Sequence, residues 1–230
     1  MKIGLLSDIH GNHIAMKAVM EFLLPEVDTF AFLGDLCGYY PFLSECLDLY
    51  PRDNVVGVLG NHDSVLIDCY NKQIVPSSHY EDKYGSAISK SLLTVTDDKL
   101  EPLLELPLTV SINWCGVEIA MYHGAPWDFL QGRIYPDYQN WERFTDVSAD
   151  IILLGHTHYP LVKFVHGKHI INPGSVGQAR NCSGLACCAI LDLSTTSVSL
   201  HNIPYPTKSI IESAKVNDPN IKYLVEVLER

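Results

Sequence analysis

Four short phrases built from Asp, Asn, His and Gly are spread widely along the chain, and each follows an apolar run with the residue types of a β-strand. They occupy residues 7–12, 34–35, 60–63 and 155–158, and His123-Gly124 is a fifth candidate. Asp, Asn and His supply the oxygen and nitrogen donors that bind divalent metals. We therefore expect a fold in which several strand ends converge and deliver these side chains to one point.

The spacing inside two phrases supports a shared centre. Asp8 and His10 are two residues apart, and so are His156 and His158. Residues i and i+2 of an extended chain point to the same side, so each pair could face one metal centre. A single pair of this kind is common by chance. The combination of all the phrases indicates a metal site.

The order of apolar runs predicts an α/β fold. Strands expected at residues 3–7, 29–33 and 54–59 alternate with helices at 12–24 and 43–49, which is the pattern of parallel βαβ units. Later segments predict a hairpin, a further apolar strand, antiparallel strands and a closing helix that is interrupted near Asp218-Pro219. Their ranges are 109–122, 151–154, 162–202 and 209–230.

We expect one domain over residues 1–230, because 230 residues with 47% hydrophobic content can bury a single core. We predict that two segments are insertions into this domain. Residues 64–106 are polar and predict helices near 83–93 and 99–104, whereas residues 126–147 are aromatic-rich and predict a helical or irregular segment. The aromatic side chains of that second insertion could stack on a nucleobase, or they could pack its core.

Charge and cysteine content narrow the function. The formal charge is −11, which disfavours a nucleic-acid polymer as partner but allows a small anionic substrate beside metal ions. Seven cysteines without a C-x-x-C pair predict free thiols in a reducing cytoplasm. The polar residues Ser7-Asp8 come too early for a secretory signal, and no apolar run is long enough to cross a bilayer.

Taken together and in this order, the five phrases resemble those of the calcineurin-like metallophosphoesterases, from Met1 to about Leu193. Residues 38–41 and 172–178 resemble the small bacterial and archaeal phosphodiesterase branch. The resemblance implies two mixed β-sheets packed as a sandwich and flanked by helices, a four-layer α/β/β/α arrangement with metals at the strand ends.

The resemblance also implies a ligand set for two divalent ions, drawn from manganese, iron, nickel, cobalt and zinc. One ion would be held by Asp8, His10 and His158, and the other by Asn61, His123 and His156. Asp35 would bridge them, because a carboxylate has two accepting oxygens. A hydroxide shared by the ions would attack phosphorus in line with the ester bond.

Four further residues carry expected roles. His62 would protonate the departing alkoxide or stabilise its charge, with Asp63 holding the His62 ring; the alternative for Asp63 is a helix cap, and both are compatible. Asn12 could contact phosphate or cap the first helix. Arg180 could bind a substrate phosphate or face solvent.

The sequence leaves several functions open. Hydrolysis of a small phosphodiester, cyclic or of dinucleotide type, is the first hypothesis, and a phosphomonoesterase or diadenosine-polyphosphate hydrolase is the second. A phosphoprotein phosphatase is disfavoured because Gly34-Asp35 continues as Leu36-Cys37-Gly38-Tyr39, without the Asp-Arg-Gly that follows in that class. A metal-binding scaffold for protein partners is the non-enzyme alternative, and homo-oligomer formation stays open.

Overall fold

The first of two five-stranded sheets contains the N-terminal strand at its centre. The structure, a computed structural model, describes residues 1–229. In this sheet β1, β2 and β3 are parallel, β9 is antiparallel to β1, and β10 is antiparallel to β9. In spatial order the strands are β10 (Ser197–Pro204), β9 (Leu185–Asp192), β1 (Lys2–Leu6), β2 (Thr29–Phe32) and β3 (Val55–Gly57).

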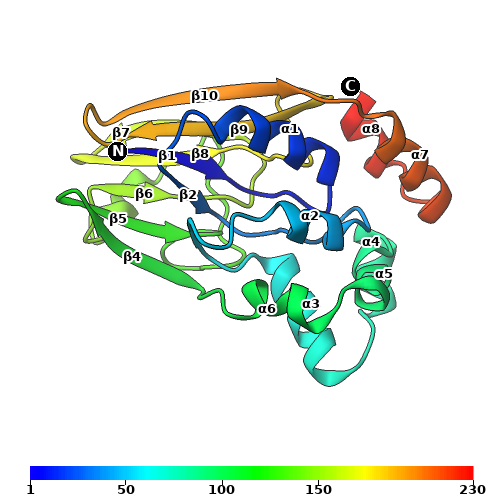
Figure 1. Ribbon diagram of the computed structural model, residues 1–230. Coiled ribbons are helices and arrows are strands. Elements are labelled where there is room, and N and C mark those ends of the chain that lie inside the picture. Colours follow the sequence, from blue (N-terminus) through cyan, green and yellow to red (C-terminus); the bar gives the residue numbers. More distant parts are fainter. Residues whose placement is uncertain (230) are drawn as a thin grey trace.

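The second sheet is also mixed. Its strands β5, β6 and β8 are parallel, and β4 and β7 are antiparallel to their neighbours at the two edges. In spatial order they are β4 (Thr109–Trp114), β5 (Val117–Tyr122), β6 (Ile151–Leu153), β8 (Lys168–Pro173) and β7 (Pro160–Val165). Figure 1 shows the two sheets stacked face to face, which confirms the expected sandwich of two mixed sheets flanked by helices.

Side-chain alternation along the strands builds the core. In β1, Ile3 and Leu5 belong to the apolar cluster between the sheets, together with Ile151 and Leu153 of β6. Gly4 faces the other way: a Cβ atom there would lie 2.9 Å from Phe30 and 3.3 Å from Leu23, so the helix above packs directly on the strand. Both faces of this sheet are therefore buried, as parallel sheets require.

Helices cover the outer face of the first sheet and one end of the sandwich. α1 and α2 cover the face, the helices of the first insertion continue from β3, and the last two helices lie at the end of the sandwich (Figure 1). The helices are α1 (His13–Leu23), α2 (Leu43–Leu49), α3 (Asn61–Lys72), α4 (Ser78–Tyr84), α5 (Ala87–Thr94), α6 (Asp97–Leu104), α7 (Lys208–Asn217) and α8 (Tyr223–Glu229).

One expected helix differs from the structure, and the second insertion takes the irregular of its two expected forms. The helix predicted over 83–93 is divided into α4 and α5, because the backbone N–H and hydroxyl of Ser86 donate to the carboxylate of Asp218 at the break. The segment 126–147 is irregular apart from the short 3₁₀ helix Trp141–Phe144. The closing helix is interrupted after Asn217 as predicted, and its expected last residue lies outside the described range.

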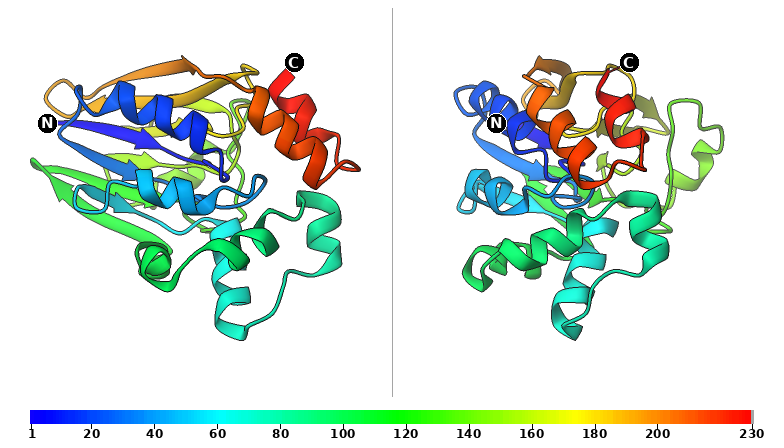
Figure 2. Two further views of the ribbon diagram at one scale, coloured as in Figure 1. Left: turned by 45° about the vertical axis from the view of Figure 1, so that its right-hand side comes forward. Right: turned by 90° about the vertical axis from the view of Figure 1, so that its right-hand side faces the viewer.

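The carboxyl ends of β1, β2 and β3 point toward the end of the molecule where α7 and α8 lie. The second view agrees, with α7 and α8 beside the loops that leave these strands (Figure 2). Within residues 1–229, the structure has no helix of the length and apolar character that a bilayer crossing needs.

Candidate metal centre

The candidate ligands all lie just beyond strand ends or at the start of a helix that comes after one. Residues from β1, β2, β3, β5 and β6 contribute, so the metal-ligand phrases do converge as expected. Three overlapping groups of possible ligands result, and all are largely buried: Asp8, His10 and His158; Asp35, His123 and His156; and between them His10, Asp35 and His62. The candidates are Asp8, His10, Asp35, Asn61, His123, His156 and His158.

Five of these side chains project from left-handed backbone. Their φ angles are 54° at Asp8, 53° at His10, 61° at Asp35, 65° at His156 and 63° at His158. This region is disfavoured for residues with a Cβ, and such conformations persist where the surroundings enforce them, which is typical of functional sites. The expectation that extended backbone would aim these side chains is therefore wrong, and His156 and His158 face different groups.

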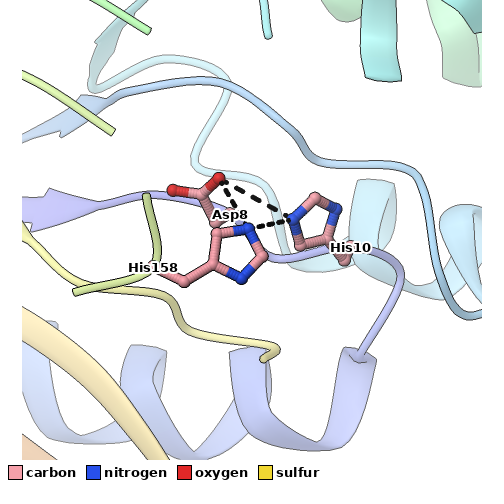
Figure 3. A group of neighbouring side chains, drawn as sticks. All are labelled: Asp8, His10 and His158. Atoms are coloured by element: carbon pink, nitrogen blue, oxygen red, sulfur yellow. Dashed lines mark hydrogen bonds and ion pairs between the residues drawn. The ribbon is translucent and has the colours of Figure 1, made fainter. Parts of the chain in front are cut away.

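The first ligand group consists of Asp8, His10 and His158 (Figure 3). Asp8 Oδ2 accepts from the Ser7 hydroxyl at 2.5 Å and from the backbone N–H of His156 at 3.0 Å. Asp8 Oδ1 is buried without a hydrogen-bond partner, 3.3 Å from His158 Nε2 and 3.7 Å from His10 Nε2. A buried carboxylate oxygen left in this state is costly unless a cation binds it.

The two histidines of this group are oriented by backbone carbonyls. His10 Nδ1 lies 3.1 Å from the Cys37 carbonyl oxygen, and His158 Nδ1 lies 3.0 Å from the Gln178 carbonyl oxygen. A carbonyl only accepts, so each Nδ1 carries a proton and each Nε2 is directed inward. The two Nε2 atoms are 3.0 Å apart, a contact that a cation bound between them would stabilise.

The second ligand group is formed by Asn61, His123 and His156. His123 Nε2 lies 3.0 Å from Asn61 Oδ1 and 3.2 Å from His156 Nδ1. His123 Nδ1 donates to the Leu33 carbonyl at 2.7 Å, which again fixes the ring. The three atoms that could coordinate a metal are two histidine nitrogens and one amide oxygen, and this set suits a borderline divalent metal.

Asp35 lies between the two groups. Its Oδ2 atom is 3.3 Å from His123 Nε2 in the second group and 3.9 Å from His10 Nε2 in the first. The other oxygen, Oδ1, accepts from the backbone N–H of His62 at 2.8 Å. One carboxylate oxygen is thus close to both groups, as a bridging ligand requires.

Electrostatics also fit bound cations. Burial alone would raise the pKa of Asp35, but His123, His62 and His10 hold it below its usual range, and His158 and His10 do the same for Asp8. Burial would lower the pKa of His123, yet Asp35 raises it to about 9. Negative charge therefore already attracts protons to this site, and divalent cations suit the same donors.

His62 projects into the space beside the first group. Its ring centroid is 5.1 Å from that of His10, and its Nδ1 is hydrogen-bonded to the hydroxyl of Tyr80 on α4. Burial lowers the pKa of His62 to about 3, with Asp35 opposing, so the ring is neutral at pH 7. A neutral ring can donate one hydrogen bond through the nitrogen that carries the proton.

Asp63 does not hold the His62 ring, and that expectation is wrong. Its carboxylate accepts three backbone N–H groups, from Asp35 at 2.7 Å, Gly60 at 3.1 Å and Cys37 at 3.1 Å. The bond from Gly60 confirms the helix-cap alternative. The other two fix the loop that carries Asp35, so Asp63 orients the ligand between the two groups.

Asn12 caps α1, which confirms one of its two expected roles. Its Oδ1 accepts from the backbone N–H of Ala15, and its Nδ2 donates to the Gly177 carbonyl and the Tyr205 hydroxyl. The side chain is completely buried. No donor of Asn12 is left for a substrate phosphate, so the structure contradicts that expected contact.

A pocket of about 320 Å³ opens over the candidate metal centre, and we call it the central pocket. Arg180 lines it, rather than facing open solvent. Tyr39 of the 38–41 motif and Tyr135 of the aromatic-rich segment also line it. Four further lining residues were not singled out from the sequence, because they come from α4, the second insertion and α8 and share no local motif. They are Lys83, Tyr84, Arg133 and Tyr223.

Most of the aromatic side chains of the second insertion pack over the outer face of the second sheet. Trp127, Tyr138, Trp141 and Phe144 contact one another in a cluster that includes Ile152 of β6. This confirms core packing for these four.

Comparisons with known proteins agree with this architecture. A sequence model of the calcineurin-like phosphoesterase superfamily domain matches residues 1–196. An uncharacterized protein of Methanocaldococcus jannaschii is 30% identical over 239 aligned residues, which cover 94% of this chain and 92% of that protein.

Solved structures are similar over most or all of the chain. A metallophosphoesterase from Sphaerobacter thermophilus is 26% identical, with a TM-score of 0.80 over 100% of this chain and 99% of that chain. A structure described as a novel archaeal phosphodiesterase has a TM-score of 0.56 and 19% identity over 88% of this chain and 100% of that chain, a likeness of fold alone.

Proposed function

Because this chain belongs to the calcineurin-like phosphoesterase superfamily, a metal-dependent family of phosphoester hydrolases, we propose that it hydrolyses small phosphodiesters with two divalent metal ions. The position of Asp35 carries this proposal. Its Oδ2 atom lies within 4 Å of a histidine nitrogen in each ligand group, which supports two adjacent ions rather than one. Adjacent ions can hold the attacking and leaving oxygens of one phosphate.

We assign Asp8, His10 and His158 to one ion and Asn61, His123 and His156 to the other, with Asp35 shared. The partnerless Oδ1 atom of Asp8 and the inward Nε2 atoms of the histidines support this assignment. Bound there, the ions would supply a strong nucleophile from water at neutral pH and would stabilise charge on the phosphate oxygens.

His62 is the proposed proton donor to the leaving group. It is nearly fully buried at the floor of the central pocket, and the Tyr80 hydroxyl restrains its ring. In the absence of substrate the ring is neutral, since burial lowers its pKa. A phosphodiester anion or a developing alkoxide beside the ring would raise that pKa, which favours the protonated ring that can give a proton to the leaving oxygen.

The residues directly after Asp35 favour a diester over a phosphoprotein as substrate. Leu36, Cys37 and Gly38 are all buried there and offer no cationic side chain to a protein-bound phosphate. The archaeal phosphodiesterase shares the fold, and the activity in its name is consistent with the proposal. Synthetic diesters fit a pocket of about 320 Å³ that is open to solvent.

The proposal is tested by assaying bis-p-nitrophenyl phosphate beside p-nitrophenyl phosphate, after loading the metal-free protein with each of manganese, iron, nickel, cobalt and zinc. We expect a higher kcat/KM on the diester with at least one metal and no turnover in excess chelator. Preference for the monoester with every metal would replace the diesterase by a phosphomonoesterase. Absence of turnover on both would favour a binding role.

A further inference from the structure

Three cationic side chains line the central pocket without a partner carboxylate. Lys83, Arg133 and Arg180 form no ion pair within residues 1–229, although the chain has 27 acidic and 16 basic residues. Elsewhere in residues 1–229, Lys72 and Lys99 pair with aspartates, although most other basic side chains also form no ion pair. What distinguishes the three cationic side chains is that they lie together at one pocket of an otherwise acidic protein.

This charge exceeds what the proposed function needs for one diester. Two divalent ions would bring four positive charges, whereas Asp8, Asp35 and a phosphodiester bring three negative ones. The three cationic side chains add positive charge to a site where the metal ions would already offset the negative charge of the carboxylates and the diester. Since unpaired cations in a pocket attract anions, the surplus indicates a substrate with more negative charge than a single diester.

Arg180 is the most firmly oriented of the three. Its Nε donates to the Tyr223 hydroxyl at 3.1 Å, and that hydroxyl donates to Gln178 Oε1 at 3.1 Å. Within residues 1–229 the two terminal nitrogens of Arg180 have no hydrogen bond. The backbone N–H of Arg180 donates to the carbonyl of His158, so the guanidinium is attached close to the first ligand group. It is half-buried, which strengthens its attraction for an anion.

Tyr223 comes from the C-terminal helical pair, beyond the residues that the family model matches. It is the first residue of α8, which lies at the strand ends beside the loops of the centre (Figures 1 and 2). The Tyr40 hydroxyl donates to the carbonyl of the next residue, Leu224, whose side chain is completely buried. The hydroxyl of Tyr223 is thus held in place by the core and in turn orients Arg180.

We propose that Arg180, positioned by the Tyr223 hydroxyl, binds a second phosphate of the substrate, one that is not hydrolysed. This rests on the proposed function, because it takes the metal centre as the place where the scissile phosphate binds. The substrate class is then a phosphodiester that carries at least one further phosphate. Tyr223 is a positioning residue that acts through Arg180.

The test measures binding of cleaved-product analogues to the metal-loaded protein by calorimetry. Two matched pairs are used: adenosine 5′-monophosphate with adenosine 3′,5′-bisphosphate, and adenosine 5′-monophosphate with adenosine 5′-diphosphate. In the unmodified protein we expect at least one doubly phosphorylated ligand to bind about tenfold tighter than the monophosphate, the strength of a charge-assisted bond to phosphate.

Arg180→Gln is expected to abolish this preference while leaving affinity for the monophosphate nearly unchanged. Tyr223→Phe keeps the ring and removes only the hydroxyl, so we expect the preference for the doubly phosphorylated ligand to fall by about two- to fivefold. Arg52→Gln and Tyr70→Phe are the matched controls outside the pocket, since both also lose hydrogen bonds, and they should leave the preference intact.

Equal affinity within both pairs in the unmodified protein overturns the inference. So does an Arg180→Gln protein that loses affinity equally for singly and doubly phosphorylated ligands, since Arg180 would then bind the scissile phosphate. If bis-p-nitrophenyl phosphate is hydrolysed without such a preference, only this inference fails. If the preference exists without any turnover, the second-phosphate site stands and the proposed diesterase function fails.

Discussion

His10 Nε2 and His158 Nε2 face each other at 3.0 Å, although each ring donates its Nδ1 proton to a backbone carbonyl. Two lone pairs at this distance repel, and burial keeps His158 neutral by lowering its pKa to about 4 against the attraction of Asp8. The fold holds the two rings in place through the Cys37 and Gln178 carbonyls. This arrangement fits a cation bound between the two rings, in agreement with the proposed metal centre.

Gly60, which lies between β3 and α3, lets the backbone pass close to Asp35. A Cβ atom at position 60 would lie 2.1 Å from Asp35 Oδ1 and 2.2 Å from its backbone nitrogen. We predict that Gly60→Ala displaces Asp35 and lowers metal affinity by about 10- to 100-fold, the range for disturbing a ligand's support. Titration calorimetry measures the effect.

Gly116→Ala is the control for this substitution. No atom lies within 4 Å of a Cβ there, but the φ of 86° strains alanine. It should reduce the free energy of unfolding by about 1 kcal/mol and leave metal affinity unchanged. Equal metal affinity in the Gly60→Ala protein and the unmodified protein contradicts the account of Asp35.

His62→Ala is predicted to retain metal and lose turnover by about 10²- to 10⁴-fold, as expected for loss of a general acid. Steady-state kinetics on bis-p-nitrophenyl phosphate and metal analysis of the same sample separate the two effects. His79→Ala is the matched control, because His79 is exposed on α4. If the His62→Ala protein hydrolyses the diester at the original rate, His62 is not the proton donor.

Arg133 competes with metal at His156. Its Nε donates to His156 Nε2 at 3.2 Å, which places the His156 proton on Nδ1, the atom that faces His123. A metal at Nδ1 needs the opposite tautomer and is repelled by the guanidinium. We predict that Arg133→Gln increases metal affinity by about two- to tenfold, a gain of about 0.4–1.4 kcal/mol. Calorimetry that shows weaker or equal binding contradicts this competition.

His156 gives a pH prediction for the metal-free protein. Burial, with the neighbouring His123, lowers the pKa of His156 to about 4 in the folded state, against 6.5 in its usual range. Between these pH values the unfolded chain binds a proton at His156 that the folded chain does not. The free energy of unfolding therefore decreases as the pH falls from 6.5 to 4.

The His156→Gln protein lacks that proton uptake. We predict that its free energy of unfolding depends less steeply on pH between 4.5 and 6, by about one proton or 1.4 kcal/mol per pH unit. Denaturant titrations at several pH values measure the two slopes. Parallel slopes would mean that His156 is not held neutral.

Much of the fold can be predicted from periodicity in the sequence. Strand and helix positions up to β3 are predictable, since apolar runs such as the one around Leu5 alternate with the helical spacing that begins after Asn12. The break between α4 and α5 is not, because it depends on Asp218, far along the chain, accepting from Ser86. Local patterns do not contain such distant contacts.

Residue type and position after strands are enough to find the candidate ligands. Their left-handed backbone at Asp8 and His156 is not predictable, because the surrounding loops enforce it rather than the residue type. The predicted partner of Asp63 is wrong for a related reason: its neighbour in sequence is His62, but its carboxylate accepts from the Asp35 loop. Tyr223 belongs to no sequence motif, so its place in the pocket could not be predicted.

The number and position of metal ions bound per chain test the central claim most directly. Elemental analysis of loaded protein, with anomalous diffraction from its crystals, should find two ions that share Asp35. One should contact Asp8, His10 and His158, and the other Asn61, His123 and His156. A single ion at saturation, or ions bound away from these side chains, contradicts the dinuclear centre.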